Sequence, residues 1–278
     1  MLIDLHAHSS VSDGTDSPTA LLEAAARADV DVLALADHDT TQGLAEARRA
    51  GSRVGVDLVP AIELSTTWRD ADVHLLVYWP DEDDEALQSM LATIRDGRRR
   101  RIPRMLARLA AHGIDVSEQD VRRVAGGAAS LGRPHVADAL VAAGIVGSRG
   151  EAFDTWIGEG MAGHVSKPAP TLRDAIATAR RAHGVPVLAH PWGRGSRSVL
   201  DVAALADLAD AGLVGLEVEH VDHDAQDRAL LRTIASQLDL VATGGSDYHG
   251  TGKEGVALGM NGTAEDAYVR LVAQRGAV

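Results

Sequence analysis

Short apolar runs alternate with helical stretches along most of the chain, and this alternation most constrains the fold. Seven runs rich in Val, Ile and Leu predict buried strands, at Met1–Leu5, Asp31–Ala36, Asp57–Ile62, Val73–Tyr78, Val185–Ala189, Gly215–Val218 and Asp239–Thr243. Helical stretches follow many of them, at Pro18–Asp29, Gly43–Arg53, Thr171–Ala182, Ser198–Asp210 and Asp224–Gln237. Strands alternating with helices predict βαβ units and a parallel sheet. Seven strands over 278 residues favour a closed or nearly closed α/β barrel.

The alternation is interrupted between Asp84 and Lys167, where the sequence is polar and has a helical pattern. This stretch contains the Arg98–Arg101 run and the segment Gly132-Arg133-Pro134-His135, which opens another predicted helix. We therefore expect residues 98–164 to form an inserted helical subdomain that caps a barrel made of residues 1–97 and 165–278.

Composition excludes several classes of protein. The chain has no cysteine, which rules out a disulfide scaffold, an iron–sulfur cluster, a thiolate zinc site and a cysteine nucleophile. Its net charge of -13 argues against binding to duplex nucleic acid, which requires basic surface. No apolar run approaches the length of a membrane-spanning helix, and the first residues show no secretory signal. These features predict a cytoplasmic protein with no membrane partner.

Histidine and carboxylate side chains recur where the apolar runs end. In α/β barrels the carboxyl ends of the strands meet at one end, and active sites are built there. Residues i and i+2 of an extended segment face the same side, so His6 with His8, and Asp247 with His249, can each present two ligands together. Nine side chains are therefore candidate metal ligands: His6, His8, Asp13, His38, Glu63, His74, His190, Asp247 and His249.

Nine ligands exceed what one metal ion uses. A single zinc ion takes three or four protein ligands, so this set suits two or three ions bridged by a carboxylate. Imidazole and carboxylate ligands without sulfur are compatible with Mn²⁺, Zn²⁺ or Fe²⁺, of which we expect Mn²⁺ first. Either His-x-His or His74 alone would be a weak signal, and the repetition at successive strand ends is what predicts a multimetal site.

These motifs resemble those of the PHP (polymerase and histidinol phosphatase) phosphoesterases. The resemblance rests on both ends of the chain: His6-Ala7-His8-Ser9, Ala36-Asp37-His38-Asp39, Glu63, His74, Ala189-His190-Pro191 and Gly245-Ser246-Asp247-Tyr248-His249. It implies a distorted (β/α)7 barrel with up to three metal ions at the strand ends. It also implies that His6, His8, Glu63 and Asp247 share one ion. Glu63 would then bridge to a second ion held by His74 and His190, and Asp13, His38 and His249 would hold the third.

The predicted insertion resembles that of one subgroup, which includes 3′,5′-nucleoside bisphosphate phosphatases and trimming exoribonucleases. The resemblance rests on Gly132-Arg133-Pro134-His135 and on Arg101 with Arg104 at the start of the insertion. The chain departs from the pattern of this subgroup at two places, Trp192-Gly193-Arg194 and Glu219-His220. Both differences bear on recognition of the base and not on the metal chemistry.

Metal ions and arginines together favour a phosphorylated substrate. Clustered divalent ions lower the pKa of a bridging water, which then serves as hydroxide, and they neutralise phosphate oxygens. Asp13, His38 and His249 are the catalytic candidates nearest the leaving group. A second phosphate needs cations, and arginine forks bind phosphate bidentately. The candidate substrate contacts are Arg101, Arg104, Arg133, His135, Arg194 and His223.

The function expected from the sequence is metal-dependent removal of the 3′-phosphate from a 3′,5′-bisphosphonucleoside. A 5′→3′ exoribonuclease on short RNA is the first alternative. Histidinol phosphatase and a non-catalytic metal- or nucleotide-binding module are further alternatives. The sequence leaves the oligomeric state open.

Overall fold

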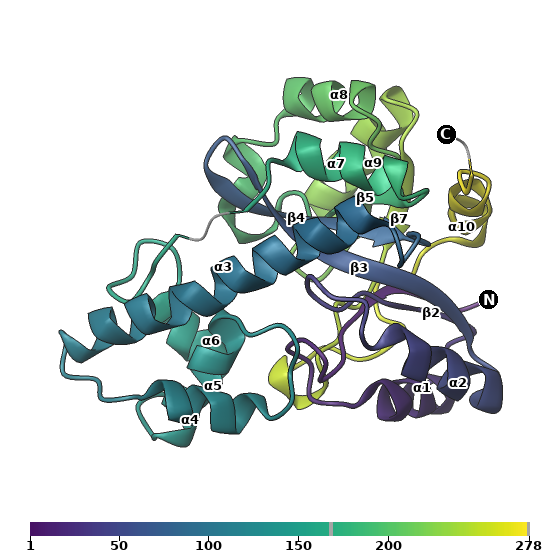
Figure 1. Cartoon of the computed structure of the whole chain (residues 1–278). Coiled ribbons are helices and arrows are strands. Elements are labelled where there is room, and N and C mark those ends of the chain that lie inside the picture. The colour runs from purple at the N-terminus through teal and green to yellow at the C-terminus, as the bar shows by residue number, and fades with distance from the viewer. Residues whose placement is uncertain (167–168, 277–278) are drawn as a thin grey trace.

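The computed structural model describes residues 1–166 and 169–276 and is built around a seven-stranded sheet (Figure 1). The strands follow one another in space in chain order: β1 (Ile3–Ala7), β2 (Val32–Leu35), β3 (Asp57–Trp68), β4 (Ala71–Tyr78), β5 (Val185–Ala189), β6 (Gly215–Glu219) and β7 (Val241–Gly244). The chain beyond β7 returns to β1, where the Asp247 N–H donates to the His6 carbonyl at 2.8 Å and the His8 N–H donates to the Tyr248 carbonyl at 2.9 Å. The sheet thus forms a nearly closed barrel of the expected α/β class.

The sheet is not parallel throughout, and the prediction of a parallel sheet is wrong at β4. β3 and β4 form an antiparallel hairpin that runs from the pair Ala61–Tyr78 to the pair Trp68–Ala71, and β4 also pairs antiparallel with β5. Arg69 and Asp70 join the two strands, and both have positive φ values, of 47° and 68°, as tight hairpin turns require. β3 continues past Ile62 through a polar stretch whose side chains gave no apolar strand signal.

Most helices cover the outside of the barrel. They are α1 (Pro18–Arg27), α2 (Leu44–Val54), α7 (Leu172–Arg181), α8 (Val202–Asp210), α9 (Ala225–Gln237) and α10 (Glu265–Val272). Ser17, Thr171, Asp201 and Asp224 each accept a hydrogen bond from the first turn of the helix that follows, which satisfies an otherwise unpaired N–H group. The first five helices match predicted stretches, whereas α10 was not predicted.

Residues 85–166 contain helices and no strand. They comprise α3 (Glu85–Ala110), α4 (Glu118–Ala125), α5 (Arg133–Ala142), α6 (Arg149–Ala152) and the π-helical turn η1 (Phe153–Ile157). α3 extends from the barrel to α4–α6 (Figure 1). Its first turns bury Leu87 and Leu91 in a core shared with the barrel. Its later turns bury Met105 and Leu109 in a second core, made only of residues from this segment.

Within the described residues, no helix is long and apolar enough to cross a bilayer.

The core between β4 and its covering helices should dominate the stability of the barrel. Leu75 is fully buried there, so Leu75→Ala should lower the free energy of unfolding by about 2–5 kcal/mol. Leu230 on α9 is 40% exposed, and Leu230→Ala should change stability by no more than about 0.5 kcal/mol. Urea unfolding of both variants measures the difference. Equal losses would contradict this description of the core.

Candidate metal centre

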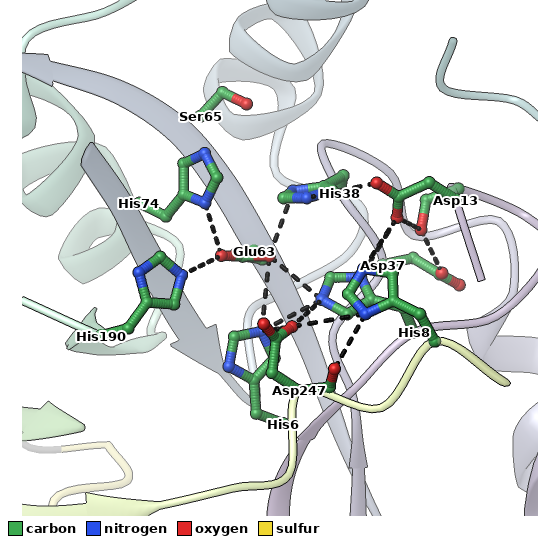
Figure 2. Close-up of polar contacts among 12 residues, drawn as sticks. His6, His8, Asp13, Asp37, His38, Glu63, Ser65, His74, His190 and Asp247 are labelled. Carbon is green, nitrogen blue, oxygen red and sulfur yellow. Dashed lines mark hydrogen bonds and ion pairs between the residues drawn. The ribbon is translucent and has the colours of Figure 1, made fainter. Parts of the chain in front are cut away.

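All nine predicted ligands lie together at one end of the barrel, and none is more than 8% exposed. In Figure 2, Glu63 lies between His74 and His190 on one side and the remaining histidines on the other. His74 reaches this cluster because β4 runs opposite to its neighbours, which pairs His74 with Ser65 on β3 and with Ala189 on β5. His74 lies in the first half of β4, as it does in the predicted run Val73–Tyr78, and the reversed direction of β4 places this half at the same end of the barrel as the other ligands.

Four ligand atoms of the cluster enclose a small space: His6 Nε2, His8 Nε2, Glu63 Oε2 and Asp247 Oδ1. The two histidine nitrogens are 3.0 Å apart. They lie 3.4 and 3.1 Å from the Glu63 oxygen, and 3.5 and 3.3 Å from the Asp247 oxygen. Ligand atoms about 2.1 Å from a tetrahedral ion are about 3.4 Å from one another. The spacing of these four atoms therefore fits one metal ion.

Two further groups adjoin the first. His8, Asp13, His38 and His249 form one of them, in which Asp13 Oδ1 lies 3.4 Å from His249 Nε2 and Asp13 Oδ2 lies 3.6 Å from His38 Nε2. The other joins Glu63 to His38 and His74. Glu63 Oε1 lies 2.7 Å from His74 Nδ1 and 3.1 Å from His190 Nε2, so the two Glu63 oxygens face different ligands.

Two buried nitrogens indicate that the cluster is built for cations. His8 Nδ1 and His38 Nδ1 form no hydrogen bond, although buried polar atoms nearly always do. Both instead face carboxylate oxygens, His8 Nδ1 at 3.7 Å from Asp13 Oδ1 and His38 Nδ1 at 3.2 Å from Glu63 Oε2. His249 Nδ1 contacts the Asp247 carbonyl at 2.9 Å, and the proton on Nδ1 leaves Nε2 as an acceptor facing Asp13. Such a hydrogen bond fixes the tautomer in known metal sites. The residues present fit divalent metal ions.

The carboxylates and histidines of the cluster shift one another's pKa values. Burial alone would raise the pKa of Asp247, but Lys253 and His6 outweigh it and hold this pKa well below its usual range. Burial alone would lower the pKa of His8, but hydrogen bonds to Asp247 and Glu63 raise it to about 9. The carboxylates are thus ionised at neutral pH, which metal binding requires.

Two carboxylates that were not predicted as site residues support the ligands. Glu217 lies on β6, where its Oε1 contacts His6 Nδ1 at 2.9 Å and its Oε2 accepts the His190 N–H at 2.8 Å. Asp37 accepts hydrogen bonds from the hydroxyls of Ser9 and Ser12, at 2.6 Å each, and so holds the loop that carries Asp13. A carboxylate at the end of a predicted strand was the available signal for Glu217.

Two predicted substrate contacts lie close together in the helical segment. Arg101 on α3 is 5% exposed, and its Nε and Nη2 have no hydrogen-bond partner. Burial and the neighbouring Arg133 lower the pKa of Arg101 to about 9. Arg133 opens α5, where its Nη2 lies 3.5 Å from Asp72 Oδ2 and its guanidinium lies over the Phe153 ring.

The structure places the other predicted contacts differently. Arg104 is exposed on α3, as expected of a solvated helix face. His223 is buried with both ring nitrogens against the main chain, Nδ1 at the Val218 carbonyl and Nε2 at the Trp192 N–H, so it fixes the loop after β5 and offers no nitrogen to a substrate. His135 Nδ1 accepts the Gly132 N–H at 3.0 Å and caps α5. The Arg194 side chain lies outside the described part of the structure.

Comparison with known proteins identifies the family. Residues 4–107 match the PHP domain. The chain is 35% identical to a 3′,5′-nucleoside bisphosphate phosphatase of Chromobacterium violaceum, over 92% of this chain and 90% of that protein. It is 31% identical to a 5′-3′ exoribonuclease of Haemophilus influenzae, over 88% and 89% of the two chains.

A solved structure from Bifidobacterium adolescentis, described as a metal-dependent phosphoesterase, has the same fold. It superposes with a TM-score of 0.93 at 36% identity, over 98% of this chain and 96% of that one. The match spans the barrel and the helical segment together. With its buried histidine and carboxylate cluster, the chain therefore belongs to the PHP family and is a metal-dependent phosphoric ester hydrolase.

Proposed function

We propose that this enzyme hydrolyses a phosphomonoester of a small nucleotide, and specifically the 3′-phosphate of a 3′,5′-bisphosphonucleoside. The observation that carries the proposal is the buried guanidinium of Arg101 with two unpartnered nitrogens. Buried donors of a cation that lack acceptors are costly, and the oxygens of a second phosphate of the substrate would accept from them. The similarity to a bisphosphate phosphatase supports the same choice.

Arg133 and His164 strengthen the case for an anion at this place. Arg133 lies close enough to lower the pKa of Arg101. Burial, Arg101 and Arg133 together lower the pKa of His164. Asp72 is the counter-charge that raises the pKa of Arg101, and Asp72 and Glu159 raise that of His164. Neither pKa is restored to its usual value, so a bound phosphate would relieve the remaining repulsion between the cations.

The separation of Arg101 and Arg133 from the metal centre, inferred from the spacing of residues along β4, suits one nucleotide. Asp72, which Arg133 contacts, and His74 are two residues apart on β4 and face the same side. Two residues of a strand span about 7 Å. A ribose with phosphates on its 3′ and 5′ oxygens covers a similar span, so one phosphate can lie at the metal centre while the other meets Arg101 and Arg133.

We propose two or three divalent ions, Mn²⁺ first, held by the nine predicted ligands with Glu63 as the bridging carboxylate. When bound, such ions lower the pKa of water and neutralise the oxygens of the reacting phosphate. Glu217 and Asp37 keep the ligand loops in place around them. Asp13 and His38 lie across Glu63 from His190 (Figure 2), and His249 Nε2 lies 3.4 Å from Asp13 Oδ1. These three residues would stabilise the leaving oxygen.

Residues 98–164 would act as a cap over this centre. Arg98 Nε lies 3.0 Å from Asp39 Oδ2, beside His38. The Ala129 N–H donates to the Val11 carbonyl at 2.8 Å, and Arg149 Nη1 donates to the Asp13 carbonyl at 3.0 Å. These contacts fasten the cap to the two loops that carry Asp13 and His38, and a cap held this close to the ligands would favour a short substrate.

Glu63→Gln should remove activity by at least a hundredfold and lower the metal content at the same time. Both losses are expected because glutamine lacks the negative charge of the Glu63 carboxylate, which two metal positions would share. Metal analysis after incubation with Mn²⁺, together with rates on 3′-phosphoadenosine 5′-phosphate, measures both effects. Glu254→Gln, at an exposed glutamate, is the matched control. Full metal content in Glu63→Gln would refute the bridging role.

Metal binding should release protons and weaken as the pH falls. The raised pKa of His8, about 9, means that this ring carries a proton at neutral pH in the metal-free protein, and the pKa of His6 is raised as well. A metal ion must displace these protons, so each costs about tenfold in affinity per pH unit lowered. Mn²⁺ calorimetry in two buffers of different ionisation enthalpy should give about two protons released per chain. Binding that is independent of pH between 6 and 8 would contradict this.

Arg133→Ala should raise the KM for 3′-phosphoadenosine 5′-phosphate about ten- to a hundredfold, because a charged contact to phosphate contributes about 1.5–3 kcal/mol. The KM for p-nitrophenyl phosphate, which has no second phosphate, should change little. Arg104→Ala, at the exposed arginine on α3, should behave like the unchanged enzyme. Equal losses on both substrates would show that Arg133 serves the scissile phosphate or the fold.

Activity should fall as oligonucleotide length increases, and this distinguishes the proposal from the exoribonuclease alternative. A long polyanion meets little basic surface on a chain of net charge -13. kcat/KM should also drop only slightly between about 50 and 200 mM salt, because few phosphates are engaged. A rate that rises up to ten or more nucleotides would favour the exoribonuclease.

A further inference from the structure

The two carboxylate oxygens of Asp247 face different surroundings. Oδ1 lies 3.5 Å from His6 Nε2 and 3.3 Å from His8 Nε2, inside the group of four atoms that fits a metal ion. Oδ2 points away from that group and lies 3.3 Å from His220 Nε2 and 2.6 Å from Lys253 Nζ. Neither His220 nor Lys253 is among the nine predicted ligands.

His220 is fully buried, and its main-chain contacts fix its tautomer. Its Nδ1 accepts the main-chain N–H of Asp222 at 3.1 Å. A main-chain N–H can only donate, so Nδ1 carries no proton and the proton of the neutral ring is on Nε2. Nε2 therefore donates to Asp247 Oδ2. His220 lies directly after β6, and its ring centre is 5.0 Å from that of His190, which leaves it little room to turn.

Lys253 is the second donor to the same oxygen. It lies in the loop after the short 3-10 turn η3 (Gly250–Gly252), and its side chain is 26% exposed. A lysine offers three donors at the end of a flexible chain. The buried, rigid His220 and the more exposed Lys253 thus approach Asp247 Oδ2 together, and both leave Oδ1 facing the histidines.

We propose that His220, assisted by Lys253, is a positioning residue that holds Asp247 by Oδ2, so that only Oδ1 is available to a metal ion. The inference rests on the proposed ligand role of Asp247. Without the two donors the carboxylate could turn or bind through both oxygens, and the ion would lose a fixed ligand. Residues that orient metal ligands typically contribute 10- to 100-fold to metal affinity.

The test compares two amide side chains at position 220. In His220→Gln the side-chain N–H can reach the place of His220 Nε2, whereas in His220→Asn it is too short to contact Asp247. Both changes are made in full-length chains that also carry Lys253→Met, so that the change of charge is common to the pair. Mn²⁺ affinity is measured by the electron paramagnetic resonance signal of the free ion. The asparagine chain should bind Mn²⁺ roughly 10- to 100-fold more weakly than the glutamine chain.

Thermal unfolding of the metal-free variants shows whether both chains fold. A second measurement needs no substitution that affects folding: ring ¹⁵N NMR of the unchanged protein should show His220 protonated on Nε2, with His220→Gln providing the assignment. Equal Mn²⁺ affinity of two folded variants, or a proton on Nδ1 of His220, would overturn the inference. Asp247→Asn separates the two claims, because an unchanged Mn²⁺ affinity in that variant would refute the ligand role of Asp247 itself.

Discussion

The Glu63 carboxylate lies in the barrel interior with imidazole nitrogens on every side. Its Oε1 faces His74 and His190, and its Oε2 faces the other three histidines nearest to it, all within 3.4 Å. Removing a carboxylate from water costs several kcal/mol unless nearby charges compensate. This carboxylate would be unstable in an apolar interior. The surrounding strands therefore have to place histidines next to it, and divalent cations bound by those histidines would compensate its charge.

Two features of the fold satisfy that requirement. The β3–β4 hairpin reverses one strand, which brings His74 next to Ser65 and thus to the same end of the barrel as Glu63. The contact of the Asp247 segment with β1 then closes the barrel, because the Asp247 N–H pairs with the His6 carbonyl. Residues from the two ends of the chain meet in one ligand group for this reason. The proposed cap is fastened to the same loops, which connects substrate binding with the metal centre.

Much of this arrangement could be predicted from the sequence. Eight of the nine ligands lie at or just beyond the ends of apolar runs, and His74 lies within one. A buried strand that ends in a histidine or an acid is a local pattern that needs no knowledge of contacts. The direction of β4 could not be predicted, because the polar residues between Ile62 and Trp68 hide the second half of β3. The helical boundary at residue 98 was expected from composition, whereas α3 begins at Glu85 and packs on both cores.

The supporting residues were harder to predict, because their roles depend on contacts between distant segments. Glu217 is recognisable as an acid at a strand end, yet only the fold shows that it contacts His6 from 211 residues away. Arg101 and Arg104 look alike in sequence, but one is buried and the other exposed. The helical periodicity of this stretch does not show which arginine is buried, because that depends on the segments that pack against α3.

Anomalous diffraction from crystals of the Mn²⁺-loaded enzyme would locate the bound ions. We expect two or three manganese peaks among the nine ligands, one in contact with Glu63 Oε1 and another with Glu63 Oε2. A single peak in crystals with saturating Mn²⁺, or peaks that do not contact Glu63, would contradict this expectation.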